Sequence, residues 1–269
     1  EGDFDRQALF EAFGRALESL NGQYISAEDV GVSPDDMVAA RRTTRHVVGL
    51  PDGTGDPSPV TAKGVFMGIQ AAAARGLGSE DLKGVKIAVQ GATGHVGAYL
   101  VRHLAEAGAE LHLADIREAE LKAIAKETGA KVVEDPNAIY DVDADIFTPC
   151  ALGAIINPNT IDRLKVKVVA GAANNQLETR DMGAELVKRG ILYAPDYVIN
   201  AGGIINVMGE IDPRFDAKWV EGKLHTLKAT LGEIMDTAAR ENRPSNIVAD
   251  EIARQRLADA AEQKALAAE

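Results

Sequence analysis

Cysteine is nearly absent from this sequence: Cys150 is the only one among 269 residues. A single cysteine excludes a disulfide within the chain and is typical of a reducing compartment, so we expect a cytoplasmic protein. Aromatic residues make up only 4% of the chain. This scarcity, together with plentiful alanine and glycine, suits close packing of helices on a sheet better than an aromatic-lined sandwich.

Basic residues and long apolar runs are also scarce. Lys and Arg number 29 against 41 Asp and Glu, which gives a net charge of −12. Because binding to a nucleic-acid backbone depends on clustered Lys and Arg, this balance argues against a nucleic-acid partner. No apolar run approaches the roughly eighteen residues of a membrane span, so no membrane partner is expected. The 5 histidines lack metal-ligand spacing, and we expect no metal.

The order of predicted elements divides the chain into three segments. Residues 1–60 contain an amphipathic helix over 6–20, a helix start at Pro34, and a loop rich in proline and glycine over 50–59. Residues 61–212 begin with a helix near Thr61 and then alternate strands and helices. Residues 213–269 are predicted to form helices without strands. The predicted strands lie at residues 85–89, 111–114, 131–133, 144–147, 166–170 and 191–193. Such alternation implies βαβ units, so we predict a doubly wound (Rossmann) α/β fold with a mostly parallel sheet.

A glycine-rich loop follows the first of these strands, which ends at Gln90. The loop reads Gly91-Ala92-Thr93-Gly94-His95-Val96-Gly97, and a helix begins within it. The first glycine allows a tight turn, the second lets backbone approach a pyrophosphate, and the third lets the helix pack close to the strand. The helix N-terminus then offers free N–H groups to an anion. We therefore predict that this loop binds a dinucleotide through Gly91, Thr93, Gly94, His95, Val96 and Gly97, although an ordinary surface position is an equal alternative for His95.

An acidic residue, Asp115, ends the second strand, and Ile116 follows it in the same predicted cofactor site. A carboxylate here accepts hydrogen bonds from the adenosine ribose and repels a 2′-phosphate, which favours NAD over NADP. Arg117 could grip a 2′-phosphate instead, but a solvated residue at a helix start is the simpler interpretation. The first two glycines are one residue further apart than in G-x-G-x-x-G, a spacing that also occurs in nicotinamide enzymes. The alternative to the whole pattern is an ordinary strand–helix turn followed by a solvated acid.

Five other segments resemble the glutamate/leucine/phenylalanine/valine dehydrogenase family, and its leucine dehydrogenases most closely. They are Leu20–Gly31, Pro57–Val65, Pro149–Gly153, Gly171–Leu177 and Ala194–Gly203. The resemblance implies a two-domain, homo-oligomeric enzyme whose active site lies between a substrate domain and a dinucleotide domain. Residues 1–60 would then be part of an α/β substrate domain, and residues 213–269 would pack back on it or make subunit contacts. The reaction implied is transfer of a hydride from the α-carbon of an amino acid to NAD, followed by addition of water and loss of ammonia to give the 2-oxo acid.

The resemblance also assigns roles to residues around the substrate. Asp29 matches the carboxylate that moves protons during imine hydration, whereas by itself it could be a turn or capping acid after Ser26. Asn200 matches the residue that hydrogen-bonds the substrate amino group, although its place before two glycines also suits a helix-entry cap. Ala27, Ile204 and Val207 match the side-chain pocket. All three are apolar, which disfavours glutamate and favours leucine, valine or isoleucine over phenylalanine, without ranking the aliphatic set.

Around the nicotinamide, Thr61 matches the hydroxyl that holds the carboxamide, while Cys150, Ala151 and Asn175 match residues that flank the ring and its ribose. Cys150 alone would be interpreted as a small buried residue, and no matched histidine makes it a nucleophile.

The two catalytic lysines of the family, one of them in a G-G-G-K segment, have no counterpart here. We therefore expect the 269-residue chain to bind NAD but to show little or no deaminase turnover. The lysines either lie in residues upstream of Glu1, which would mean that the sequence begins inside a longer protein, or are absent. Two alternatives remain open. One is a nicotinamide dehydrogenase acting on a folate-like carrier, and the other is an NAD-binding regulatory module without turnover.

Overall fold

The computed structural model describes residues 4–28, 31–50, 53, 55–212, 214 and 216–266. Its contacts divide the chain into two compact units, one formed by residues 1–57 with 203–223 and the other by residues 58–202 with 224–269. Among the described helices, none combines the length and the apolar character that crossing a membrane would require.

The first unit is built around a pair of helices. Helix α1 spans Arg6–Ser19, close to the predicted range, and α2 spans Pro34–Arg41, where a start at Pro34 was predicted. Ser33 and Asp36 form a capping box at the start of α2, and proline suits the first helical position because it has no N–H to leave unpaired. The small core of this unit consists of Leu17, Met37, Ala40, Val47 and Leu50. Helix α8 (Gly202–Ile211) continues from the second unit into this one.

One ion pair joins α1 to α2. The guanidinium of Arg6 donates to both carboxylate oxygens of Asp36, at 2.7 and 2.8 Å. This hydrogen bonding to Arg6 lowers the pKa of Asp36, against the opposing effect of its burial. Because Asp36 also accepts from the backbone N–H of Ser33 at 2.7 Å, one carboxylate both caps α2 and ties it to α1.

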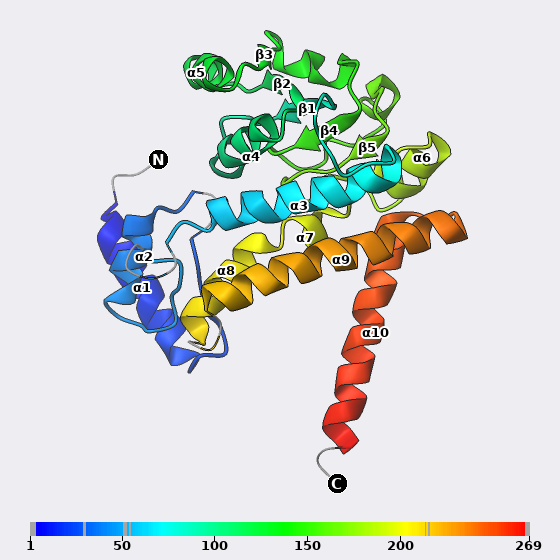
Figure 1. Cartoon of the computed structure of the whole chain (residues 1–269). Coiled ribbons are helices and arrows are strands. Elements are labelled where there is room, and N and C mark those ends of the chain that lie inside the picture. The colour runs from blue at the N-terminus through cyan, green and yellow to red at the C-terminus, as the bar shows by residue number, and fades with distance from the viewer. Residues whose placement is uncertain are drawn as a thin grey trace. The chain divides into compact units, whose positions relative to one another are not determined.

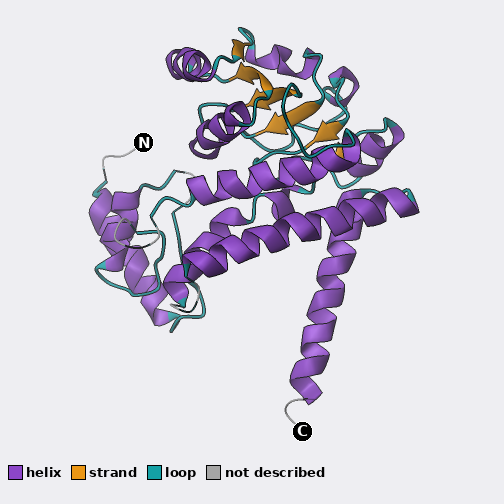
Figure 2. Cartoon of the chain, viewed as in Figure 1, coloured by secondary structure: helices purple, strands orange, loops and turns teal. Residues whose placement is uncertain are grey.

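The second unit contains a parallel sheet. In the described residues it has six strands in the order β3-β2-β1-β4-β5-β6, and every pairing is parallel. Figure 2 shows these strands in orange beside their helices. The strands are β1 (Lys86–Gln90), β2 (Glu110–Ala114), β3 (Lys131–Val132), β4 (Ile146–Pro149), β5 (Val168–Val169) and β6 (Leu192–Tyr193). The predicted doubly wound α/β fold is therefore confirmed.

Helices and 3-10 turns connect and cover the strands (Figure 1). They are α3 (Ser58–Gly76), α4 (His95–Glu106), α5 (Glu118–Thr128), η1 (Pro136–Asp141), η2 (Ile161–Arg163), α6 (Met182–Lys188) and α7 (Asp196–Ile199). Helix α3 starts three residues earlier than the predicted Thr61, because Pro59 is tolerated in the first turn of a helix.

Two hydrophobic cores lie on opposite faces of the sheet. Successive strand residues point to opposite faces, and here they alternate between the cores. Ile87 and Val89 of β1 belong to the core that also contains α3, α4 and α5, whereas Ala88 belongs to the other. In β4, Ile146 and Phe147 divide in the same way. A sheet buried on both faces explains why consecutive residues in the middle of β1 and β4 are apolar, such as Ile87-Ala88-Val89.

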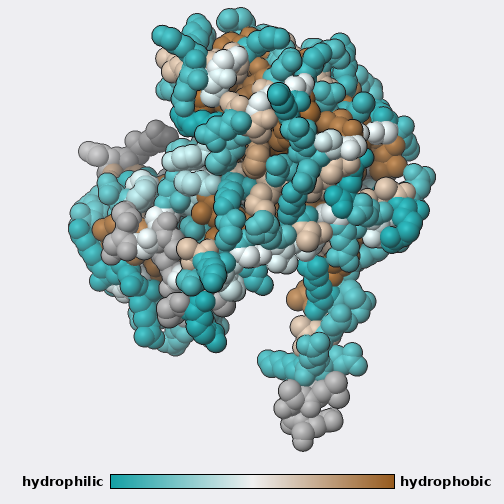
Figure 3. Space-filling model, viewed as in Figure 1, coloured by the Kyte–Doolittle hydropathy of each residue, from teal (hydrophilic) through white to brown (hydrophobic). Residues whose placement is uncertain are grey.

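The C-terminal helices are α9 (Ala217–Glu241) and α10 (Ser245–Leu266), in the segment that was predicted to form helices without strands. Residues 224–269 group with the sheet unit. Leu231 and Met235 of α9 join the core beside α3, and Arg75 of α3 binds both carboxylate oxygens of Asp236, at 2.7 and 2.6 Å. Residues 253–264 of α10 are exposed, and the distal half of this helix is largely hydrophilic in Figure 3.

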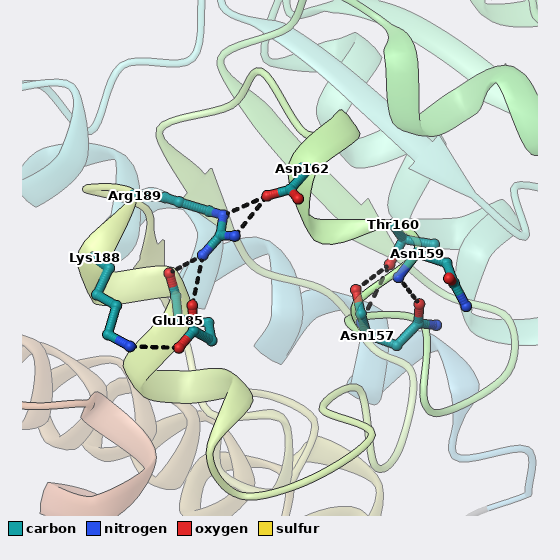
Figure 4. A network of polar contacts seen from close by, with 7 residues as sticks. All are labelled: Asn157, Asn159, Thr160, Asp162, Glu185, Lys188 and Arg189. Carbon is teal, nitrogen blue, oxygen red and sulfur yellow. Dashed lines mark hydrogen bonds and ion pairs between the residues drawn. The ribbon is translucent and has the colours of Figure 1, made fainter.

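A polar network ties α6 to η2 on the surface (Figure 4). Arg189 donates to Asp162 at 3.0 and 2.5 Å and to the side chain of Glu185 at 2.9 Å. Lys188 donates to the same Glu185 at 2.6 Å. These residues are exposed or half-buried, so this network orients the two elements more than it stabilises them.

A matched pair of leucines tests the assignment of the core. Leu113 in β2 is 0% exposed and Leu257 in α10 is 72% exposed. We predict that Leu113→Ala lowers the free energy of unfolding by about 2–5 kcal/mol, because it removes buried surface and leaves a cavity. The control Leu257→Ala should change it by less than about 0.5 kcal/mol. Urea denaturation measures both, and equal effects would contradict the assignment.

Candidate dinucleotide and substrate site

The strand order places the candidate site. The connection from β1 leads to β2 on one side of the sheet and that from β4 to β5 on the other, so the loops after β1 and β4 diverge. Ligands of doubly wound proteins bind at such a switch point, outside the carboxyl ends of the strands. Gly91, with φ +75°, turns the chain there, and a Cβ on it would lie 2.8 Å from the backbone nitrogen of Ala151. Only glycine fits this approach of two loops.

The loop after β1 leads into the N-terminus of α4. Gly94 is the N-cap and supplies no side-chain hydrogen bond, while its carbonyl accepts from Ala98 N–H at 2.9 Å. Among the described residues, nothing accepts from the N–H groups of His95, Val96 and Gly97. A diphosphate fits this set of donors, because it is an anion facing unpaired N–H groups and the positive end of a twelve-residue helix dipole. His95 itself is exposed at the first helical position.

Asp115 lies at the end of β2, tied to the same loop. Its Oδ2 accepts from Thr93 N–H at 2.9 Å and its Oδ1 from Arg117 N–H at 3.1 Å. The Arg117 guanidinium lies 3.6 Å from Oδ1. Burial of Asp115 favours the neutral acid, but these N–H donors and the Arg117 charge prevail and lower its pKa. A carboxylate has about four acceptor positions, so two remain for the two hydroxyls of a ribose. Ile116 beside it is 86% exposed.

The loops after β4 and β5 are hydrogen-bonded to the rest of this edge. Cys150 N–H donates to Gln90 O at 2.8 Å, and Ala173 N–H donates to Pro149 O at 2.9 Å. Asn175 adopts a φ of +52°, unusual for a residue with a side chain, and its carbonyl accepts from Ala154 N–H at 2.7 Å. Such a conformation persists only where the surrounding structure holds it. The structure thus brings Cys150, Ala151 and Asn175 together beside the glycine loop.

Asn200 and Thr61 lie next along this edge. The Nδ2 of Asn200 donates to Ala172 O at 3.1 Å and to Asn174 Oδ1 at 2.5 Å. Thr61 is buried in the first turn of α3. A Cβ on Gly202 would lie 2.9 Å from the Cα of Thr61, so the segment after Asn200 packs directly on α3. The Thr61 hydroxyl, the Asn200 carboxamide and the loops after β4 and β5 therefore belong to one unit with the glycine loop.

Three residues of this edge were not singled out from the sequence. Gln176 is fully buried, and its Nε2 donates to the carbonyls of Gly171 and Ala173 at 2.8 and 3.0 Å. Its backbone N–H donates to Asp196 Oδ2 at 3.2 Å, and Tyr193 donates its hydroxyl to Asp196 Oδ1 at 3.2 Å. Asn174 holds the amide of Asn200. All three lie within the motifs Gly171–Leu177 and Ala194–Gly203. Membership of these motifs is the feature of the sequence from which they could have been found.

The remaining predicted site residues belong to the first unit. Ala27 is exposed, Ile204 is 62% exposed and Val207 is 5% exposed, the last two on α8. Asp29 lies outside the described residues. The roles given to these four residues stay predictions.

Comparison with known proteins connects this geometry to a family. The sequence model for glutamate/leucine/phenylalanine/valine dehydrogenases matches residues 110–265. A leucine dehydrogenase from Thermoactinomyces intermedius is 46% identical over 254 residues, which cover 93% of this chain and 69% of that protein.

Solved structures of amino acid dehydrogenases are similar to this chain as well. The crystal structure of L-tryptophan dehydrogenase from Nostoc punctiforme is 40% identical, with a TM-score of 0.83 and coverage of 96% of this chain and 74% of that one. A glutamate dehydrogenase from Thermus thermophilus, solved as a hetero-hexamer in a leucine-bound form, is 20% identical with a TM-score of 0.75, over 97% of this chain and 70% of that one. The second likeness shows the shared fold alone.

The thiol of Cys150 provides a test of this geometry. Its burial raises its pKa to about 12, against a backbone hydrogen bond from Ala172. Only thiolate reacts with disulfide reagents, and at pH 8 about one thiol in ten thousand would be ionised. We predict that the folded chain reacts with Ellman's reagent far more slowly than free cysteine, whereas the urea-unfolded chain releases one equivalent at once. Rapid reaction of the folded chain would show that this thiol is activated and would contradict the effect of burial on its pKa.

Proposed function

Since the chain belongs to the glutamate/leucine/phenylalanine/valine dehydrogenase family, we propose that this amino acid dehydrogenase uses NAD to deaminate a branched-chain L-amino acid oxidatively. The products would be a 2-oxo acid and ammonia. A single observation carries the proposal: the loops bearing Gly91, Cys150, Asn175 and Asn200 are joined by backbone and amide hydrogen bonds at one edge of the sheet.

The preference for NAD rests on Asp115. Its lowered pKa keeps it ionised at neutral pH, so it attracts ribose hydroxyl donors and repels a 2′-phosphate. Arg117 could attract that phosphate, but its guanidinium lies 3.6 Å from the Asp115 carboxylate, which offsets its charge. The diphosphate would be held by the N–H groups of His95, Val96 and Gly97.

The chemistry needs a fixed amino group and a route for protons. The bound nicotinamide supplies the acceptor for the hydride that leaves the substrate α-carbon. Asn200 would accept a hydrogen bond from the substrate amino group through Oδ1, since both hydrogens of its Nδ2 are directed to other acceptors. Asp29 would take the proton released when water adds to the resulting imino acid, and return it to the departing ammonia.

The substrate class rests on Ala27, Ile204 and Val207. These apolar side chains offer neither a charge nor a hydrogen bond to a second carboxylate. Relatives of this chain include dehydrogenases named for leucine and for tryptophan, so the size of the pocket decides between them. Two branched residues favour the smaller, aliphatic side chains. The chain-wide likeness to these enzymes gives no support to a folate-like carrier. A homo-oligomeric assembly, a cytoplasmic location and division into domains at residues 60 and 212 stay predictions.

A substrate panel tests the proposal. NADH formation would be followed for the natural protein, with any residues its gene encodes before Glu1, using leucine, valine, isoleucine, phenylalanine, tryptophan and glutamate. We expect kcat/KM for the branched-chain substrates to exceed that for glutamate by about a hundredfold or more, because the proposed pocket has no partner for a second carboxylate. NAD binding without turnover of any amino acid would favour the regulatory alternative, and a preference for tryptophan would overturn the substrate assignment.

Two isoleucines of α8 provide the matched variants. Ile204→Ala should raise the ratio of kcat/KM for phenylalanine over leucine by about tenfold, since it widens the proposed pocket. Ile211 is on the same helix and 41% exposed, and Ile211→Ala should leave that ratio unchanged. Equal effects of the two substitutions would remove Ile204 from the pocket.

A further inference from the structure

Asn174 makes the shortest polar contact around Asn200. Its Oδ1 lies 2.5 Å from Asn200 Nδ2, and Ala172 O lies 3.1 Å from the same nitrogen. An amide nitrogen carries two hydrogens, so these two acceptors use both. If the Asn200 amide turned over, its Oδ1 would face the Ala172 carbonyl, which has no hydrogen to donate, and it would also oppose Asn174 Oδ1 unless that amide turned over as well. The pair of acceptors therefore selects one orientation, with Oδ1 directed away from the loop.

That orientation decides what Asn200 can bind. The amino group of an amino acid donates hydrogen bonds, so it requires the oxygen of the amide and not its nitrogen. Among the described residues, no group donates to Asn200 Oδ1. Resting on the function proposed above, we propose that Asn174 is a positioning residue, whose side-chain oxygen keeps Asn200 Oδ1 presented to the substrate amino group.

The loop that carries Asn174 is held independently of its side chain. The buried side chain of Gln176 donates hydrogen bonds to the carbonyls of Gly171 and Ala173 in the same loop. Its backbone N–H donates to the buried carboxylate of Asp196. Asp196 is in turn hydrogen-bonded by Tyr193, whose carbonyl accepts from the Ser245 hydroxyl of α10 at 2.6 Å. Asn174 itself is exposed. Replacing its side chain should therefore leave the loop folded while releasing the amide of Asn200.

Two substitutions separate positioning from a structural role. Asn174→Ala removes the acceptor, whereas Asn174→Asp keeps an oxygen in the same place and can only accept. Asn159→Ala is the matched control, because Asn159 is an exposed asparagine whose only hydrogen bond in the described structure is made by its backbone N–H, to Asn157 Oδ1 at 2.9 Å.

The first readout needs neither cofactor nor substrate. The side-chain NH₂ signals of Asn200 in a ¹H–¹⁵N NMR spectrum would be assigned by their disappearance in Asn200→Asp. In the unmodified chain both protons should exchange slowly with water. Asn174→Ala should speed exchange of one of them, while Asn174→Asp and Asn159→Ala should not. Unchanged exchange in Asn174→Ala, or equal loss in Asn174→Ala and Asn174→Asp, would overturn the proposal.

The second readout is kinetic. In the natural protein, Asn174→Ala should raise KM for the amino acid about five- to tenfold, the value of one hydrogen bond, with a smaller change in kcat and unchanged affinity for NAD. Asn174→Asp should restore KM. Loss of NAD affinity or of thermal stability in both variants would indicate a structural role and contradict the proposal. Because the NMR experiment is independent of turnover, an enzyme inactive on every amino acid would refute the proposed function without affecting the result for Asn174.

Discussion

The carboxyl edge of the sheet, where β1 and β4 lie side by side, is the constraint on which the rest of the structure depends. Parallel strands bring their ends to one edge, and the reversal of strand order between β1 and β4 makes the following loops diverge. At Gly91 the two loops approach so closely that no side chain fits between them. This contact fixes where the N-terminus of α4 points, and therefore where an anion meets its N–H groups.

The other loops of this edge are placed by hydrogen bonds to their neighbours. Cys150 is bonded to Gln90 of β1, Ala173 to Pro149 of β4, and Asn200 to Ala172 of the loop after β5. Asp115 is bonded to the glycine loop on the other side. The position of each loop is therefore fixed by hydrogen bonds to a neighbouring loop or strand. A ligand lying along the edge would meet donors and acceptors whose geometry is set before it binds, which lowers the cost of binding.

Much of this architecture follows from local patterns. Strands over 85–89 and 111–114 were predicted from mostly apolar runs that end near a glycine or an acid, and the structure has them at 86–90 and 110–114. Helix α1 was predicted because its apolar residues recur at helical spacing. The strands β3, β5 and β6 are shorter than predicted, with two residues each, because their apolar runs continue beyond the paired backbone. The grouping of α9 with the sheet depends on packing against α3, which is distant in sequence and leaves no local signal.

The candidate site also has a part that could be predicted from local sequence and a part that depends on contacts between distant residues. The glycine loop and Asp115 could be found from spacing, because strand, turn and helix follow each other along the chain. The contacts of Gln176 with Asp196 and of Asn174 with Asn200 join residues 20 and 26 positions apart. These hydrogen bonds form only because the fold makes the loops neighbours. In the sequence, a single asparagine or aspartate is as readily explained by a turn, a helix cap or a surface position. Only the folded sheet edge distinguishes them.

Calorimetric titration of the folded chain with NAD and NADP tests the central claim most directly. If the diphosphate docks on the N-terminus of α4 with its ribose held by Asp115, NAD should give saturable heat at one site per chain, and NADP should bind at least about tenfold more weakly, because its 2′-phosphate meets a carboxylate. Absence of heat from NAD at millimolar concentration, with the chain shown to be folded, would contradict the account.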